Sequence, residues 1–232
     1  MMTSTPSLTP RLRMTAGLVP ACGCCADIGT DHGYLIAALV MSGRCARGYA
    51  GDLRPGPLDA ARRTVEGCGL SGRITLLLSD GTDALPAEEI DAFVFAGMGG
   101  ELIAELVLRD GRLRVPGKTL ICQPMTRAGQ LRAALCGAGF RIVREDACRE
   151  GRRLYQAAAF VWDGERRALT AAEALAGRLP HRENEAAAAL LRAEVKRLRE
   201  IADACTDTAR AEESRRVAEE LSALLGGSGA EE

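Results

Sequence analysis

The sequence has few aromatic residues, no long hydrophobic run and almost no excess of charge of either sign. Only 3% of its 232 residues are Phe, Trp or Tyr, which disfavours a platform of aromatic side chains that stacks single-stranded bases. No apolar run approaches the roughly 20 residues that a membrane-spanning helix needs. The 30 Lys and Arg residues nearly balance the 31 Asp and Glu residues, and the net charge of -1 argues against a protein that is basic all over.

A disulfide framework, a metal motif and an export signal are also missing. The nine cysteines are odd in number and scattered through apolar segments, which is typical of reduced thiols in a cytoplasmic protein. Cys22, Cys24 and Cys25 lack the second cysteine or histidine pair of a zinc site, so no metal is expected. The stretch before Cys22 loosely resembles a lipoprotein signal, but Gly17 and Pro20 interrupt it and it is too short.

The chain does contain an alternation of short apolar strands and helices. Strands are predicted at 22–28, 46–50, 74–78, 91–96 and 119–122. Helices are predicted at 8–19, 34–42, 57–68, 101–108 and 128–138. This alternation predicts an α/β fold with a parallel sheet and helices on both faces. Two last strands, 140–146 and 155–162, are joined by a charged hairpin and indicate an antiparallel edge.

The composition changes after Trp162, where Ala, Glu, Arg and Leu dominate and no strand-like run remains. Apolar residues recur every three or four positions at Leu191, Val195, Leu198, Ala202 and Cys205, and again at Val217, Leu221 and Leu224. This spacing predicts two helices with a break near 206–207, packed as an antiparallel hairpin or used as a dimer contact. We therefore expect domains at 1–163 and 164–232, with a frayed tail after residue 225.

Glycines and acids gather where four predicted strands end. The four segments are Asp27-Ile28-Gly29-Thr30-Asp31-His32-Gly33, Gly51-Asp52, Asp80-Gly81 and Gly97-Met98-Gly99-Gly100. Ligands of open parallel sheets bind at the carboxyl ends of the strands. Asp31 stands in the middle of the first glycine loop, where it would repel a pyrophosphate but not the cationic groups of S-adenosylmethionine. The pattern favours a methyltransferase that uses this cofactor, with other nucleotide-binding α/β folds as the alternative.

Five segments carry a resemblance to a known family. ADIGTDHGYL, AGDLRPGPLDAAR, LSDGTDAL, FAGMGGELI and ICQPMT are similar, in order and spacing, to the bacterial tRNA (adenine-N1)-methyltransferases that act on adenine 22, the TrmK type. The similarity runs from about Leu8 through Val161. It implies a Rossmann-like class I methyltransferase domain followed by a coiled-coil-like helical hairpin, with S-adenosyl-L-methionine as cofactor and tRNA as partner.

The resemblance also implies a cofactor site. Asp27, Gly29 and Asp31 would line the methionine part of the cofactor. Asp52 stands where the family usually has Glu as the ribose ligand, and Asp80 would hold the adenine. The remaining members of this set are Thr30, His32, Gly33, Leu53, Gly81, Ala96, Gly97 and Met98.

The expected chemistry is a direct attack of adenine N1 on the methyl group, so the enzyme positions the base and stabilises developing positive charge. Asp31 and Gln123 are the catalytic candidates, and His32 is either a rival base or a structural residue. The base must leave its stack, and Tyr34, Met98 or Met125 are candidates to stack on it. Because Met125 replaces the family's frequent Asn, Thr126 or Gln123 would have to contact the base.

The charge is uneven along the chain. Residues 109–153 hold eleven Lys and Arg against four Asp and Glu, a net charge of +7. Arg127, Arg152 and Arg153 in this stretch are expected to contact the tRNA backbone, the alternative being a solvated face with local ion pairs.

The leading prediction is a cytoplasmic tRNA (adenine-N1)-methyltransferase, a monomer or weak dimer without metal or membrane contact. The alternatives are a methyltransferase of small molecules or proteins and a non-catalytic nucleotide-binding module.

Overall fold

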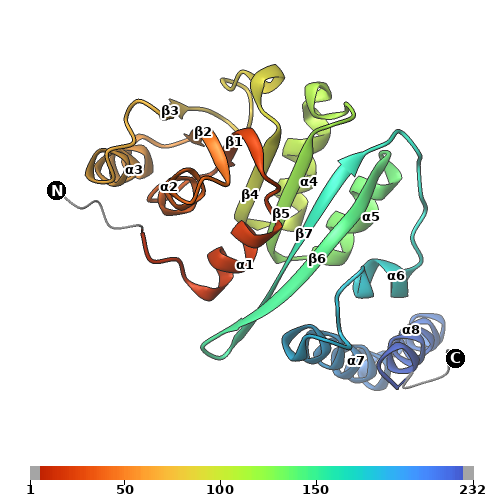
Figure 1. The fold of residues 1–232 in the computed structure, drawn as a ribbon. Coiled ribbons are helices and arrows are strands. Elements are labelled where there is room, and N and C mark those ends of the chain that lie inside the picture. Colours follow the sequence, from red (N-terminus) through yellow and green to blue (C-terminus); the bar gives the residue numbers. More distant parts are fainter. Residues whose placement is uncertain (1–5, 227–232) are drawn as a thin grey trace, which may run out of the picture.

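A single seven-stranded sheet organises the protein, whose computed structural model describes residues 6–226. The strands are β1 (Cys22–Ile28), β2 (Cys45–Asp52), β3 (Ile74–Leu78), β4 (Ala92–Gly99), β5 (Thr119–Thr126), β6 (Phe140–Glu150) and β7 (Arg153–Trp162). Their order is β3-β2-β1-β4-β5-β7-β6 (Figure 1). The strands from β3 to β5 are parallel, and β7 and β6 add antiparallel pairs, so the predicted parallel sheet with an antiparallel edge is confirmed.

Helices cover both faces of this sheet. One face carries α1 (Pro10–Leu18), α2 (Tyr34–Met41) and α3 (Pro55–Gly67), and the other carries α4 (Gly100–Arg109) and α5 (Ala128–Gly137). Successive side chains of β4 alternate between the two cores, so Phe93 and Phe95 pack with α4 and α5 while Val94 packs with α1 and α2. Burial on both faces explains why the central strands are continuous apolar runs.

Helix α1 packs against strands that lie far from it in the sequence. It begins where predicted, since Thr9 caps it by accepting a hydrogen bond from the amide of Leu12 and Pro10 occupies its first turn. It packs on β6 and β7, and the amide of Arg11 donates to Glu150 at 3.0 Å. The first helix of the chain is therefore fastened to the last two strands of the sheet.

Strands β4, β6 and β7 extend beyond their predicted bounds. β4 continues through its glycines to Gly99 because its register shifts around Met98, with Gly97 at a positive φ of 81°. β6 and β7 continue to a tight turn at Gly151, where φ is 58°, with Glu150 paired to Arg153 at the end of the ladder and α1 packed against the two strands. The resulting hairpin projects beyond the rest of the sheet (Figure 1).

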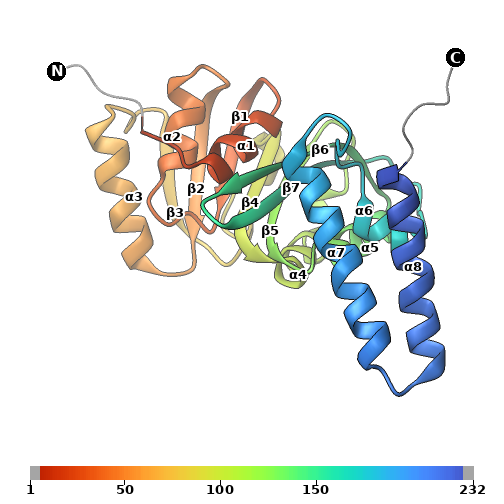
Figure 2. The ribbon, with the colours of Figure 1, turned by 90° about the horizontal axis from the view of Figure 1, so that it is seen from below.

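The chain ends in three helices, α6 (Ala171–Ala176), α7 (Glu185–Ala204) and α8 (Thr208–Gly226). The predicted hairpin is confirmed: α7 and α8 lie side by side and extend away from the sheet (Figure 2), with Leu191, Leu198 and Leu221 buried between them. Leu224 was wrongly assigned to this seam: its side chain is 44% exposed, and the neighbouring Leu225 makes the apolar contact.

Helix α6 was not predicted, because it is too short to show periodicity. A capping box starts it: Thr170 accepts from the amide of Glu173, and the Glu173 carboxylate accepts from the amide of Thr170. The domain boundary at residue 163 stays a prediction. The expected tail lies, from residue 227 on, outside the described residues, and within residues 6–226 no helix is long and apolar enough to cross a membrane.

A buried ion pair holds α6 against the sheet. Arg132 of α5 donates through Nε to Glu145 of β6 at 2.7 Å, and both side chains are almost fully buried. The Arg132 guanidinium also donates to the carbonyl oxygens of Ala174 and Leu175 in α6, at 2.9 and 3.3 Å, while Glu145 accepts the amide of Arg178. One pair of charges therefore connects α5, β6 and the start of the C-terminal helices.

Candidate functional site

Two adjoining clefts open at the carboxyl edge of the sheet, where β1 and β4 lie side by side and the strand order reverses. One has a volume of about 320 Å³ and the other about 420 Å³. Gly29, Asp52, Arg54, Ala96 and Gly97 line both. Every residue of the predicted cofactor set lines at least one of them, as expected for a ligand site at the carboxyl ends of parallel strands.

The loop after β1 is shaped by two glycines at positive φ. Gly29, at 73°, and the next residue, Thr30, donate their amides to the carbonyl oxygen of Gly51 in β2 at 2.8 and 3.0 Å. Gly33, at 69°, begins α2, and a Cβ there would lie 3.1 Å from the Cβ of Ala61 in α3. Any side chain at Gly33 would be strained and would press α2 away from α3.

Asp27 is the buried acid of the site. Its side chain accepts a hydrogen bond from the Thr30 hydroxyl at 2.8 Å and lines the larger cleft. The pKa of Asp27 is raised from 3.8 to about 6. Burial is the largest cause; the Thr30 hydrogen bond opposes it and the nearby Asp52 adds to it. Such a carboxyl group favours a cation in the cleft, because a cation stabilises its ionised form.

Asp52 and Asp80 stand at the ends of β2 and β3. Asp52 is buried and accepts the amide of Arg54 at 2.8 Å, which fixes its carboxylate at the junction of the two clefts. Asp80 lies in the smaller cleft, half exposed, and pairs with Arg109 of α4 at 3.3 Å; Arg109 also contacts Asp83.

Asp31, His32 and Tyr34 form the rim of the larger cleft. The Asp31 carboxylate lies 3.3 Å from Nε2 of His32, and the side chains are 78% and 51% exposed. The rings of His32 and Tyr34 stack with centroids 5.3 Å apart and planes 13° apart. These side chains therefore face solvent, where a substrate would enter.

Gln123 is not exposed to a substrate, contrary to its assignment as a catalytic residue. Its side chain is fully buried; Oε1 accepts from Arg11 at 2.7 Å and from the amide of Gly97 at 3.1 Å. Its Nε2 donates to the carbonyl oxygen of Pro124. With both ends of its amide occupied, Gln123 holds the bulge of β4 in place and does not reach a base.

Arg11 is a residue of the site that the sequence did not reveal. It reaches from α1 into the larger cleft, donates to Gln123, and lies over the ring of Tyr155 at 5.7 Å from its centroid. No spacing rule connects Arg11 with residues more than a hundred positions away, and the only available signal was its position in the first predicted helix.

The predicted substrate residues fall into two groups. Met125 and Thr126 are exposed at the end of β5, and Arg127 follows them in a left-handed conformation, with φ 58° and ψ 39°, paired with Glu101. Arg152 and Arg153 are exposed at the turn of the β6–β7 hairpin. Because β7 runs antiparallel to β5, this turn rises from the same edge of the sheet as the two clefts.

The cations of residues 109–153 divide between contacts inside the fold and exposed positions, and a tRNA-binding patch on this stretch stays a prediction. Arg112 pairs with Asp110 at 2.8 Å, Lys118 donates to the backbone oxygens of Ala87 and Ile90, and Arg132 is buried. These cations are used inside the fold, so the alternative of local ion pairs holds for them. Three of the exposed arginines of this stretch, Arg149, Arg152 and Arg153, lie at the turn of the hairpin, and the others are Arg109, Arg114, Arg127, Arg141 and Arg144.

The cysteines behave as apolar residues. Burial raises the pKa of the Cys22 and Cys24 thiols to about 11, which keeps them protonated. Among residues 6–226 no group of three or more His, Cys, Asp or Glu side chains is arranged to hold a metal ion.

The sheet order, the glycine loop after β1 and the acids at successive strand ends define a Rossmann-like methyltransferase fold. A sequence model described as "Methyltransferase domain" matches residues 8–157. The tRNA (adenine(22)-N(1))-methyltransferase of Bacillus subtilis is 35% identical over 150 residues, which are 64% of this chain. The match spans 63% of that relative, somewhat under two thirds of its length.

Solved structures extend the similarity to the C-terminal helices. The crystal structure of the B. subtilis M1A22 tRNA methyltransferase TrmK has a TM-score of 0.81 at 26% identity and covers 95% of this chain and 99% of its own. A Streptococcus pneumoniae protein in complex with S-adenosyl-L-methionine has a TM-score of 0.81 at 27% identity. The match covers 93% of this chain and 99% of that protein. The chain belongs to the methyltransferase-domain family, and it is similar to methyltransferases of the TrmK type over nearly its whole length.

Proposed function

We propose that the protein transfers the methyl group of S-adenosylmethionine to N1 of an adenine in tRNA, adenine 22 by similarity to the B. subtilis relative. The observation that carries the proposal is the pair of acid-lined clefts at the strand-order switch, with the buried Asp27 at the centre. The alternative substrates, a small molecule or a protein, are disfavoured by the arginine-bearing hairpin that rises from the same edge.

The residues of the clefts fit S-adenosylmethionine. Asp27, whose pKa is raised mainly by burial, suits the ammonium and sulfonium groups of the methionine part, because a cation would stabilise its ionised form. Asp52, oriented by the amide of Arg54, suits the ribose hydroxyls, and Asp80 with Gly81 suits the adenine ring. When bound, the cofactor supplies an electrophilic methyl group.

The chain positions the base and stabilises its developing charge. Adenine N1 has an in-plane lone pair, so no covalent intermediate with the protein is needed. Asp31, exposed at the rim, is available to stabilise positive charge on the base, and the stacked pair of His32 and Tyr34 offers a flat surface for a base that has left its helix. Arg11, Gln123 and Gly97 hold the opposite side of the cleft.

The proposed tRNA contacts are Met125, Thr126 and Arg127 at the end of β5 and Arg152 and Arg153 on the hairpin. The apolar seams of α7 and α8 are buried against each other, which supports a monomer. A cytoplasmic location stays a prediction.

The function is tested by incubating the protein with methyl-labelled cofactor and a bulk tRNA pool, followed by nucleoside analysis. The expected product is 1-methyladenosine, in amounts that fall steeply as salt is raised. Label that appears on protein, on small molecules or on another base would refute the proposal.

Affinity for the cofactor is expected to depend on pH through Asp27. Below its pKa of about 6 the carboxyl group is neutral and no longer attracts a cation, so affinity should fall about tenfold from pH 7.5 to pH 5. Titration calorimetry across this range measures the change. The control Asp27→Asn should bind weakly at every pH, and a wild-type affinity that does not vary with pH would contradict the assignment.

The stability of the unliganded protein should change in the opposite direction. Because folding raises the Asp27 pKa, its contribution is complete below the unfolded pKa of about 4 and is lost as pH rises through about 6. The difference corresponds to about 3 kcal/mol. Thermal unfolding of wild type and Asp27→Asn at pH 5 and pH 7.5 should detect roughly half of this contribution, because pH 5 lies midway between the two pKa values.

Asp31→Ala is expected to lower kcat about tenfold and to leave the KM for tRNA within about twofold, since one exposed charge near the base contributes on the order of 1.4 kcal/mol to the transition state. Steady-state kinetics with saturating cofactor provide the measurement. His32→Ala is the matched variant, because it removes the side chain paired with Asp31 without removing the carboxylate. An unchanged kcat in Asp31→Ala would remove Asp31 from the mechanism.

A further inference from the structure

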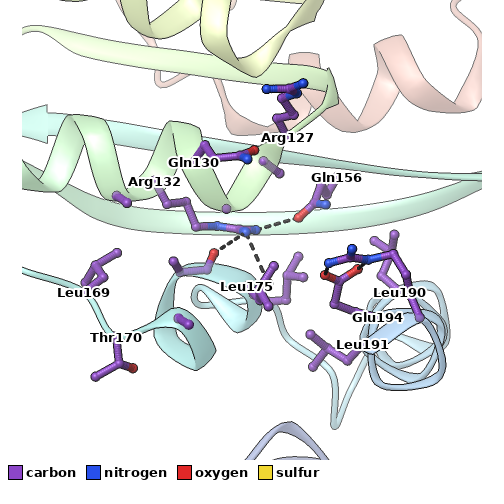
Figure 3. Close-up of a pocket in the computed structure, with 17 residues that line it drawn as sticks. Arg127, Gln130, Arg132, Gln156, Leu169, Thr170, Leu175, Leu190, Leu191 and Glu194 are labelled. Carbon is purple, nitrogen blue, oxygen red and sulfur yellow. Dashed lines mark hydrogen bonds and ion pairs between the residues drawn. The ribbon is translucent and has the colours of Figure 1, made fainter. Parts of the chain in front are cut away.

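A third cavity, separate from the two clefts, lies where the sheet domain meets the C-terminal helices. It has a volume of about 730 Å³ and is enclosed by α5, α6 and α7, with the buried Arg132 and Gln156 of β7 at its floor (Figure 3). We call it the junction cavity. Its volume lies in the range of small-ligand sites, roughly 300–1,000 Å³.

The lining of the junction cavity is part apolar and part polar. Leu175 of α6 and Leu190 of α7 supply apolar walls, and Gln130 of α5 and Gln156 bring two amide groups (Figure 3). The Gln156 oxygen accepts from Arg132 at 2.5 Å, and its NH2 group has no hydrogen-bond partner among the described residues. Amide groups beside flat apolar walls suit the edge and the faces of a nucleobase.

Three arginines, Arg127, Arg132 and Arg197, line the cavity. Each already pairs with a carboxylate, that of Glu101, Glu145 and Glu194 respectively, so a phosphate in the cavity would share these guanidinium donors with them. Lysine is absent from the lining, and guanidinium groups bind phosphate through several donors at once.

The junction cavity also lies close to the proposed target site. Arg127 lines it, and Gln123, which supports the larger cleft, is only four residues earlier along β5. Four extended residues span at most about 14 Å. A strand of RNA whose adenine occupies the cleft would therefore pass within reach of this cavity.

We propose that the junction cavity binds a second nucleotide of the same tRNA, one close to the target adenine, and so contributes to the choice of substrate. The base would lie between Leu175 and Leu190 with its edge on Gln130 and Gln156, and its phosphate would face Arg197. The inference rests on the proposed function, because it takes tRNA as the substrate.

The first test fills the cavity from its exposed edge. Ala133 lines it from the solvent side of α5, so Ala133→Trp should occupy the space without disturbing the core. The expected result is a KM for tRNA raised about tenfold, with the Kd for the cofactor and kcat within twofold of wild type. Glu66→Trp, which places the same side chain on an exposed face of α3, should behave as wild type.

The second test changes the RNA and leaves the junction cavity intact. Nucleotides next to the target adenine are replaced one at a time by abasic residues in a synthetic tRNA. One of these changes should raise the KM of the wild-type enzyme and add nothing further in Ala133→Trp, because both remove the same contact. Gln156→Ala, which creates no bulk, should raise the KM at least threefold and serves if Ala133→Trp does not fold.

The outcomes separate this inference from the proposed function. If the wild-type protein forms no 1-methyladenosine in tRNA, the function itself fails. If it does, and both Ala133→Trp and Gln156→Ala have the wild-type KM, or if every abasic change is additive with Ala133→Trp, the junction cavity holds no nucleotide.

Discussion

Replacing Arg132 by leucine is expected to lower the free energy of unfolding by about 3–5 kcal/mol, because the Glu145 carboxylate would be left buried without its counter-charge. The same change removes the donors that hold the carbonyl oxygens of Ala174 and Leu175 in α6. A loss of this size is a large fraction of the roughly 5–15 kcal/mol that stabilises a typical domain. Urea unfolding followed by circular dichroism measures it.

The matched control is Arg141→Leu. Arg141 also lies on the sheet and also pairs with an acid, Asp163 at 3.3 Å, but its side chain is 46% exposed. An exposed pair contributes at most about 1 kcal/mol, so this variant should remain close to wild type. Equal effects of the two substitutions would show that the burial of the Arg132–Glu145 pair has no energetic consequence.

Asp52→Ala is expected to weaken cofactor binding about 10- to 100-fold. A carboxylate that accepts hydrogen bonds from two hydroxyl groups contributes about 1.5–3 kcal/mol, and the buried Asp52 is held in position by the amide of Arg54. Titration calorimetry gives the Kd directly. The catalytic step should be much less affected once the cofactor is saturating, because Asp52 is assigned to the ribose and not to the base.

Asp59→Ala is the control for this experiment. Asp59 is an exposed acid of α3, seven residues further along the chain, and lines neither cleft. It removes the same charge from the protein without touching the site. If Asp59→Ala weakens cofactor binding as much as Asp52→Ala does, the effect is one of net charge and the ribose assignment is wrong.

The cofactor edge was predictable because its signals are local. Each acid or glycine lies at or just after the carboxyl end of a strand. Parallel strands bring such positions together, so the prediction needs no information on side-chain packing. The bulge in β4 was not predictable, since Gly97 signals a turn equally well, and its hydrogen bond to Gln123 depends on how two strands align.

Contacts between distant residues account for the errors. The sequence presents Arg132 as one of eleven cations on a charged stretch, and only the fold shows that it is buried beside Glu145. Gln123 was assigned to the base because of its position in a motif, although its amide is consumed inside the protein. Arg11 was missed because its partner Gln123 lies 112 positions along the chain.

The docking of α1 on β6 and β7 has a consequence for how the protein is made. Arg11 leaves the ribosome well before its partner Glu150, which lies 139 positions later. Until that segment has been synthesised, α1 lacks the strands β6 and β7 against which most of its contacts are made, and a nine-residue helix is marginal by itself in water. The wall of the larger cleft is therefore completed after all the other strands of the sheet, and a truncated nascent chain carries the glycine loop without a finished site.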